Sequence, residues 1–217
     1  MASLTQVLVF ISGCGRYRSP SQRSSILTAS SCGFMTVCSL PFFLDWVQSG
    51  GNLAAVQPRP ALAETACVGL MAYMIFHLAL GVLFYRRELL LGWHWIHHAI
   101  FTFVLSFAIR NHVAHYFVLA GTMEFPIYVM FVGFLEPSLR NDYLTAVTTF
   151  AFRIVFHLIL LVQWCLPTNR LLVGSGINQW VPASLAITAL PGHIQLCYST
   201  VQRAIRSSKQ KQALLSP

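Results

Sequence analysis

The sequence predicts an all-helical protein that lies in a membrane as a polytopic bundle of about five transmembrane helices. Of its 217 residues, 56% are hydrophobic and only 9% are charged, and the mean hydropathy is +0.63. Soluble domains carry about a quarter charged residues, so this composition indicates extensive contact with lipid. The apolar residues are gathered in long stretches, and a helix of about 20 residues is enough to cross the hydrocarbon core.

Four apolar stretches are well defined, and short polar hinges separate them. They cover residues 62–84, 93–109, 113–135 and 144–166, of which the second is at the short limit for a span. A fifth stretch, 179–201, is weaker because Pro182, Pro191 and Gly192 interrupt it. Short hinges make consecutive helices antiparallel, so we expect one compact membrane domain over residues 61–203.

Residues 1–60 differ in composition from the rest of the chain. They are rich in serine and contain no acidic residue before Asp45. This composition is typical of a transit peptide or a disordered leader, and a wrongly assigned first exon would also produce it. An apolar piece at 33–48 contains Pro41 and Asp45, so we expect a re-entrant or interfacial piece, or a partial sixth span.

The net charge of +8 does not indicate a nucleic-acid partner, because the basic residues do not form one face. One side of the bundle is expected to carry Arg86, Arg87, Arg140 and the basic tail at 204–217. The other side is expected to carry Arg59, Arg110 and Arg170. The positive-inside rule then predicts a cytosolic carboxy terminus, with the segment before residue 62 on the opposite side. Retained near the bilayer, Arg16, Arg18 and Arg23 would weaken this asymmetry.

Two adjacent histidines, His97 and His98, stand at the head of the second apolar stretch, with His94 one turn earlier. On a helix, residues at i, i+3 and i+4 share a face. Imidazoles at this depth are costly to bury, and adjacent side chains point about 100° apart, so at least one should face inward. We therefore take His97 and His98 as candidate catalytic residues.

Charged side chains also occur inside the later apolar stretches. Glu124 needs a proton, a partner or water at that depth, and Arg153 is the expected counter-charge. Arg153 and His157 are four residues apart and share a helical face. The Glu124 and Arg153 pair could equally be structural and fix the register of two helices. Pro126 is expected to free a backbone carbonyl one turn earlier and to kink the helix there.

The remaining histidines are expected to have no chemical role. His77 and His193 each stand alone in an apolar stretch, which favours a hydrogen bond between helices. His112 and His115 border a short hinge and are expected to be solvated.

Taken in order, these residues resemble the TLC domain of eukaryotic polytopic membrane proteins. The resemblance runs from residue 62 to 201 and is carried by His97-His98, Thr102 and Met123-Glu124-Phe125-Pro126. A later helix with Phe150, Phe152, Arg153 and His157 also matches. Residues 72–77 look like a Gly-Tyr segment of the family, with His77 where an aspartate is usual.

The resemblance implies an integral membrane protein of the endoplasmic reticulum or another endomembrane that binds or handles acyl lipids in an intramembrane cavity. His97, His98 and Glu124 would form the site, and Thr102, Arg153 and His157 would bind the lipid. Membrane lipids are the expected partners, and no cofactor is implied.

One branch of the family offers the alternative function of an N-acyltransferase. In ceramide synthases the double histidine serves acyl transfer from acyl-CoA, the cosubstrate, to a sphingoid amine. That branch has a pair of aspartates downstream, whereas this chain has no acidic residue between His98 and Glu124. The match is therefore closer to the small TLC-domain proteins associated with membrane lipid composition.

A third hypothesis is a membrane di-iron hydroxylase or desaturase. His94-x-x-His97-His98 has the spacing of one histidine box, and His112-x-x-His115 imitates half of another. Imidazole suits iron, but a two-metal site needs many converging ligands, and eight histidines form too few organised boxes. We therefore expect no metal site.

Overall fold

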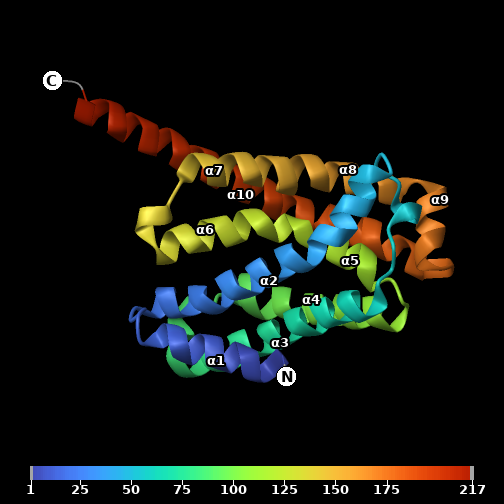
Figure 1. The fold of residues 1–217 in the computed structure, drawn as a ribbon, viewed down its shortest axis with the longest axis horizontal. Coiled ribbons are helices and arrows are strands. Elements are labelled where there is room, and N and C mark those ends of the chain that lie inside the picture. Colours follow the sequence, from blue (N-terminus) through green and yellow to red (C-terminus); the bar gives the residue numbers. More distant parts are fainter. Residues whose placement is uncertain (1, 216–217) are drawn as a thin grey trace. The chain divides into compact units, whose positions relative to one another are not determined.

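The structure, a computed structural model, describes residues 2–215, with side chains for residues 6–92 and 94–210. Within the described residues every regular element is helical and none is a strand, which confirms the all-helical prediction (Figure 1). The chain divides into two compact units, Met1–Glu124 and Phe125–Pro217. The domain bounds expected from the sequence, 1–60, 61–203 and 204–217, stay a prediction.

Four helices of the described chain are long and apolar enough to cross a membrane. They are α2 (Pro20–Gln48), α3 (Pro60–Phe84) and the continuous helices Ala114–Leu135 and Asp142–Cys165. The last three confirm the first, third and fourth apolar stretches of the sequence. The stretches at 93–109 and 179–201 are also helical, as α4 (His97–Arg110) and part of α10 (Val181–Leu215), but they are not among these four.

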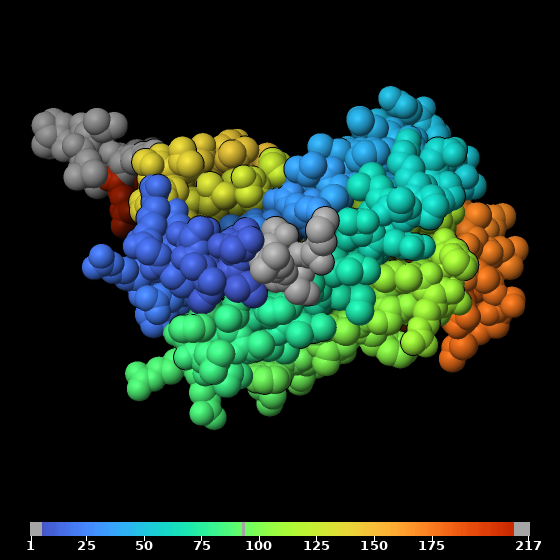
Figure 2. Space-filling model, turned by 60° about the horizontal axis from the view of Figure 1, so that its bottom comes forward, coloured from blue at the N-terminus to red at the C-terminus, as the bar shows by residue number. Residues whose placement is uncertain are grey.

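The segment before residue 60 contains two helices, α1 (Ala2–Cys14) and α2, where the sequence suggested a poorly defined leader. α1 packs against α2 and α3, and Figure 2 shows its blue surface beside that of α3. A capping box begins α2, in which the Ser19 hydroxyl accepts from the Gln22 N–H and the Gln22 side chain accepts from the Ser19 N–H. The apolar piece at 33–48 is the second half of this helix, so the further span suggested there is longer than the sequence indicated.

The serines and threonines of α2 explain why its sequence hides a span. Several of their hydroxyls donate to carbonyls of the preceding turn, as Ser25 does to Ser21 at 2.8 Å and Thr36 to Cys32 at 2.7 Å, although the buried Ser31 hydroxyl has no partner. A hydroxyl satisfied inside its own helix needs no water, so the helix tolerates an apolar environment despite its polar composition.

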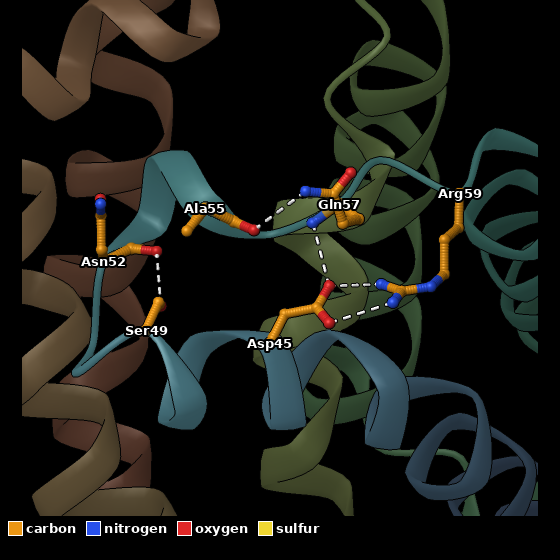
Figure 3. A network of polar contacts seen from close by, with 6 residues as sticks. All are labelled: Asp45, Ser49, Asn52, Ala55, Gln57 and Arg59. Atoms are coloured by element: carbon orange, nitrogen blue, oxygen red, sulfur yellow. Dashed lines mark hydrogen bonds and ion pairs between the residues drawn. The ribbon is translucent and has the colours of Figure 1, made fainter.

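One carboxylate fixes the loop between α2 and α3. Both terminal nitrogens of Arg59 donate to Asp45, and the Gln57 N–H donates to Asp45 Oδ2 at 3.0 Å (Figure 3). The paired carboxylate raises the pKa of the Arg59 guanidinium. Ser49 also donates to the Asn52 carbonyl at 3.3 Å, and a 3-10 turn, Leu53–Ala55, follows. This short, cross-linked loop makes α2 and α3 antiparallel.

The later part of the first unit consists of shorter elements. A 3-10 turn, Arg86–Glu88, and a π-helical segment, Leu91–Ile96, lead into α4. α5 (Ala114–Ala120) continues into a 3-10 turn, Gly121–Glu124. The change of helix type agrees with Pro126, whose missing N–H leaves a carbonyl of the preceding turn without its donor.

The second unit is built around α10. It begins with α6 (Phe125–Leu135) and a 3-10 turn, Pro137–Leu139. The helix Asp142–Cys165 consists of α7 (Asp142–Thr148), a π-helical segment (Thr149–Phe156) and α8 (His157–Cys165). The short elements α9 (Pro167–Arg170), Leu171–Val173 and Gly176–Trp180 follow. α10 packs along α7, the π-helical segment and α8 (Figure 1).

We expect the Asp45 and Arg59 pair to contribute a coupling free energy of about 0.5–1 kcal/mol, because both side chains are partly exposed. A double-mutant cycle with Asp45→Asn and Arg59→Gln, followed by thermal unfolding in detergent, measures it. The coupling should shrink as salt is raised, since mobile ions screen exposed charges. Single effects that simply add would contradict the pairing.

Candidate functional site

Four imidazoles gather in the first unit, and we call His77, His94, His97 and His98 the histidine cluster. The ring centre of His77 lies 5.3 Å from that of His94 and 5.2 Å from that of His98. The His94 and His98 centres are 6.1 Å apart, and the His97 and His98 centres 5.7 Å apart. Tyr73 closes the group, with its ring 5.7 Å from His98 and 5.4 Å from His77.

The buried members of the cluster are not fully hydrogen-bonded. His98 is only 5% exposed, and both of its ring nitrogens are buried without a hydrogen-bond partner. His77 is 1% exposed, and its Nδ1 is also buried and unpartnered. An unsatisfied buried polar group costs about 1–3 kcal/mol. These imidazoles therefore reduce the stability of the bundle, which is the pattern of a site that receives a polar ligand.

Local helix geometry positions two members of the cluster. The π-helical segment Leu91–Ile96 carries His94, and its backbone passes directly into α4 at His97. The Leu90 N–H donates to His94 Nδ1 at 2.9 Å, which satisfies a backbone donor at the start of this segment. π-helical turns are rare and are frequent at functional sites. The expectation that at least one histidine of the adjacent pair faces inward is confirmed, because His98 is buried.

Tertiary contacts bring in the other members, which the sequence did not indicate. His77 Nε2 lies 3.2 Å from the Ser24 hydroxyl of α2. The Tyr85 hydroxyl donates to the His77 carbonyl at 2.9 Å, and burial raises the pKa of this phenol, so it remains a neutral donor. The hydroxyls of Thr28 and Tyr73 are 3.0 Å apart. The one signal in the sequence was the spacing of Tyr73 and His77, which places them on one helical face.

Glu124 is not part of the histidine cluster, because it contacts α2 at Cys32 whereas the cluster contacts α2 at Ser24. The Cys32 thiol donates to Glu124 Oε2 at 3.2 Å, and Cys32 follows Ser24 on α2 by about two turns. Glu124 ends the first unit and Arg153 belongs to the second, so their expected pairing stays a prediction.

The three residues expected to bind lipid have different surroundings. Thr102 directs its hydroxyl at the Met74 sulfur, 3.9 Å away, between α4 and α3. In the second unit, Arg153 Nη1 lies 3.0 Å from His193 Nε2. His157, 2% exposed, contacts the Ala186 carbonyl through Nε2 at 2.9 Å. These contacts join the helix Asp142–Cys165 to α10, so both side chains have a structural role, and the interhelical contact expected of His193 is confirmed.

The histidines of the hinge behave differently from each other. His112 is exposed in a left-handed turn with φ of 55°, as a solvated hinge residue should be. His115 was expected to be solvated, but it is buried at 7% exposure, with its ring 3.9 Å from that of Tyr116. The neighbouring helices cover it, and hinge length alone did not show this. Among the residues with described side chains, no three His, Cys, Asp or Glu are arranged to hold a metal ion.

Comparisons with known proteins give no match to a family model, to a curated protein or to a solved structure. The resemblance to the TLC domain therefore stays a prediction, and the geometry of this chain carries the functional argument.

We expect His98→Leu to leave the ligand-free protein equally stable or more stable by about 1 kcal/mol, because it removes two unpartnered polar atoms. His157→Leu should instead lower stability by about 1 kcal/mol, since it removes a hydrogen bond between the helix Asp142–Cys165 and α10. Thermal unfolding in the same detergent compares the two variants. A loss of stability for His98→Leu as large as that for His157→Leu would show that His98 is structural.

Proposed function

We propose that this chain is a TLC-like integral membrane protein that binds acyl lipids at the histidine cluster and so influences membrane lipid composition. The observation that carries the proposal is the set of three buried, unpartnered ring nitrogens on His77 and His98. A lipid headgroup that donates and accepts hydrogen bonds would satisfy them. His157 in the second unit has a protein partner at one ring nitrogen, whereas His98 has none at either.

The surroundings of the cluster suit an amphiphilic ligand. α3 supplies His77, Tyr73 and Met74 and is one of the four helices able to span a membrane. Thr102 follows His98 by one turn on α4, so an acyl chain that leaves the cluster along α4 would pass Thr102 and Met74. The headgroup would therefore lie near the polar end of the unit and the chain among apolar side chains.

Charge supports an orientation for the first unit. α2 and α3 are antiparallel, so the arginines before and at the start of α2 share an end with those after α3: Arg16, Arg18, Arg23, Arg86 and Arg87. The opposite end carries Arg59 and Arg110. With α2 as a span, the early arginines reinforce the asymmetry that they were expected to weaken. The positive-inside rule then favours a cytosolic side for the histidine cluster.

The same rule orients the second unit, and the compartment follows from the proposed function. Arg140 pairs with Asp142, which also accepts from Ser207 near the basic residues of α10, so these groups share one end of the unit. We assign that end and the carboxy terminus to the cytosol, in the endoplasmic reticulum or another endomembrane. Side chains of residues 211–217 in the basic tail lie outside the described residues.

An acyl-CoA-dependent N-acyltransferase is the second candidate function. It is favoured by His98, because both ring nitrogens of this imidazole are unpartnered and one of them can accept a proton from a bound amine. Acyl-CoA would be the cosubstrate and a sphingoid amine the acceptor. Transfer from labelled acyl-CoA to long-chain amines, in membranes that contain the protein, separates this activity from lipid binding alone.

We expect a diazirine-bearing fatty acid to photocrosslink to the purified protein, and the His97→Ala/His98→Ala variant to lose most of this labelling. The reason is that the variant removes the buried groups proposed to hold the headgroup. His112→Ala is the control, because His112 is an exposed hinge residue. Equal labelling of all three proteins, at equal abundance in the membrane, would contradict lipid binding at the cluster.

We expect single cysteines at Gly15 and Lys209 to react with a membrane-impermeant maleimide from the cytosolic side of sealed vesicles. A cysteine at Gln57, in the loop between α2 and α3, should react only after detergent is added. The measurement uses a cysteine-free background. Reaction of Gln57→Cys and Gly15→Cys from the same side would show that α2 does not cross the membrane.

A further inference from the structure

Ser24 and His77 form a contact that the proposed lipid-binding site does not require. The Ser24 hydroxyl lies 3.2 Å from His77 Nε2, within reach of a hydrogen bond. A serine hydroxyl is a weak nucleophile by itself and becomes reactive when an adjacent imidazole can accept its proton. We propose that Ser24 is an acyl-accepting nucleophile with His77 as its base, and that acyl thioesters acylate it. This inference rests on the proposed binding of acyl lipids.

The Ser24 hydroxyl points to a different partner from that of its neighbour Ser25. Ser25 is buried and donates to the Ser21 carbonyl of its own helix at 2.8 Å. Ser24 is half-buried and faces an imidazole of another helix. Nucleophile and base thus stand on two long helices, α2 and α3, whose packing fixes their separation. The half-buried position leaves Ser24 accessible to a reactant.

The protonation of His77 follows from its contacts. If Ser24 donates to Nε2, the ring proton of neutral His77 is on Nδ1, which is buried without a partner. In Ser-His-Asp sites a carboxylate stabilises the imidazolium through this nitrogen. Here no hydrogen-bond partner reaches His77 Nδ1, and the neighbouring imidazole of His98 has its ring centre 5.2 Å away.

The acyl transfer balances with these groups. Ser24 Oγ attacks the thioester carbonyl while its proton moves to His77 Nε2, and a tetrahedral intermediate forms. The intermediate collapses as the carbon–sulfur bond breaks, and the leaving thiolate takes the proton from His77. The products are an ester on Ser24 and a free thiol. Water or another acceptor then attacks the ester, with His77 again as base, and restores the serine.

The charges near Ser24 indicate the class of thioester. Arg23, the preceding residue, has a buried Nε without a hydrogen-bond partner. Arg86 and Arg87 lie at the same end of the unit, directly after α3. Guanidinium groups bind phosphate oxygens strongly and with fixed geometry. We therefore expect the acyl donor to be the thioester of a phosphate-bearing thiol carrier.

The experiment traps the nucleophile with an alkyl fluorophosphonate in full-length protein held in lipid nanodiscs. We expect one adduct on Ser24, located by peptide mass spectrometry, and none in Ser24→Ala. His77→Gln keeps a hydrogen-bond partner for Ser24 but is no base, so labelling should slow by about 100-fold. Ser25→Ala is the matched control and should react like the wild type. Prior incubation with palmitoyl-CoA should protect Ser24 from the probe.

Three results would overturn the inference: no adduct in the wild type, an adduct that persists in Ser24→Ala, or equal rates for His77→Gln and the wild type. Thermal unfolding identifies a variant that has failed to fold. If Ser24→Ala fails to fold, the labelling rate of His77→Gln compared with that of Ser25→Ala provides the test. A wild type that crosslinks the diazirine fatty acid but takes no fluorophosphonate defeats the nucleophile alone. A wild type that takes the fluorophosphonate on Ser24 but crosslinks no fatty acid defeats the proposed lipid binding alone.

Discussion

Polar groups inside an apolar bundle must find partners within the protein, because no bulk water is present to satisfy them. α2 depends on this constraint most clearly, since hydroxyls such as those of Ser25 and Thr36 donate to carbonyls of their own helix. Those internal bonds let α2 pack beside α3 as a helix long and apolar enough to span a membrane. The packing of α2 on α3 then places Ser24 against His77 and Thr28 against Tyr73.

The imidazoles of the two units meet the same constraint differently. In the second unit, His157 contacts the Ala186 carbonyl and His193 contacts Arg153, so these histidines tie helices together, although Nδ1 of His157 is buried without a partner. In the first unit, His98 has no hydrogen-bond partner although it is buried. A fold keeps such a costly group when it serves binding or chemistry. This difference separates a structural use of histidine from the proposed functional one.

Both units use a π-helical segment just before a buried histidine. Leu91–Ile96 precedes His97 and His98, and Thr149–Phe156 precedes His157. A π-helical turn accommodates an extra residue, so it changes the direction of the following side chains relative to a regular helix. The helical spacing of His94, His97 and His98 predicted that these residues lie together, while the π-helical segment sets where each ring points.

The sequence by itself determined the helical class, three of the four candidate spans and the burial of one of the paired histidines, because apolar length and helical spacing are local properties. Only tertiary structure decided that α2 belongs to the bundle and that His77 and Ser24 meet, since that contact joins residues 53 positions apart. Hydrogen bonds of hydroxyls within a helix leave no trace in hydropathy, and a lone histidine gains its neighbours only when α2, α3 and α4 pack. Packing therefore decided which residues surround the pair that the sequence had already identified.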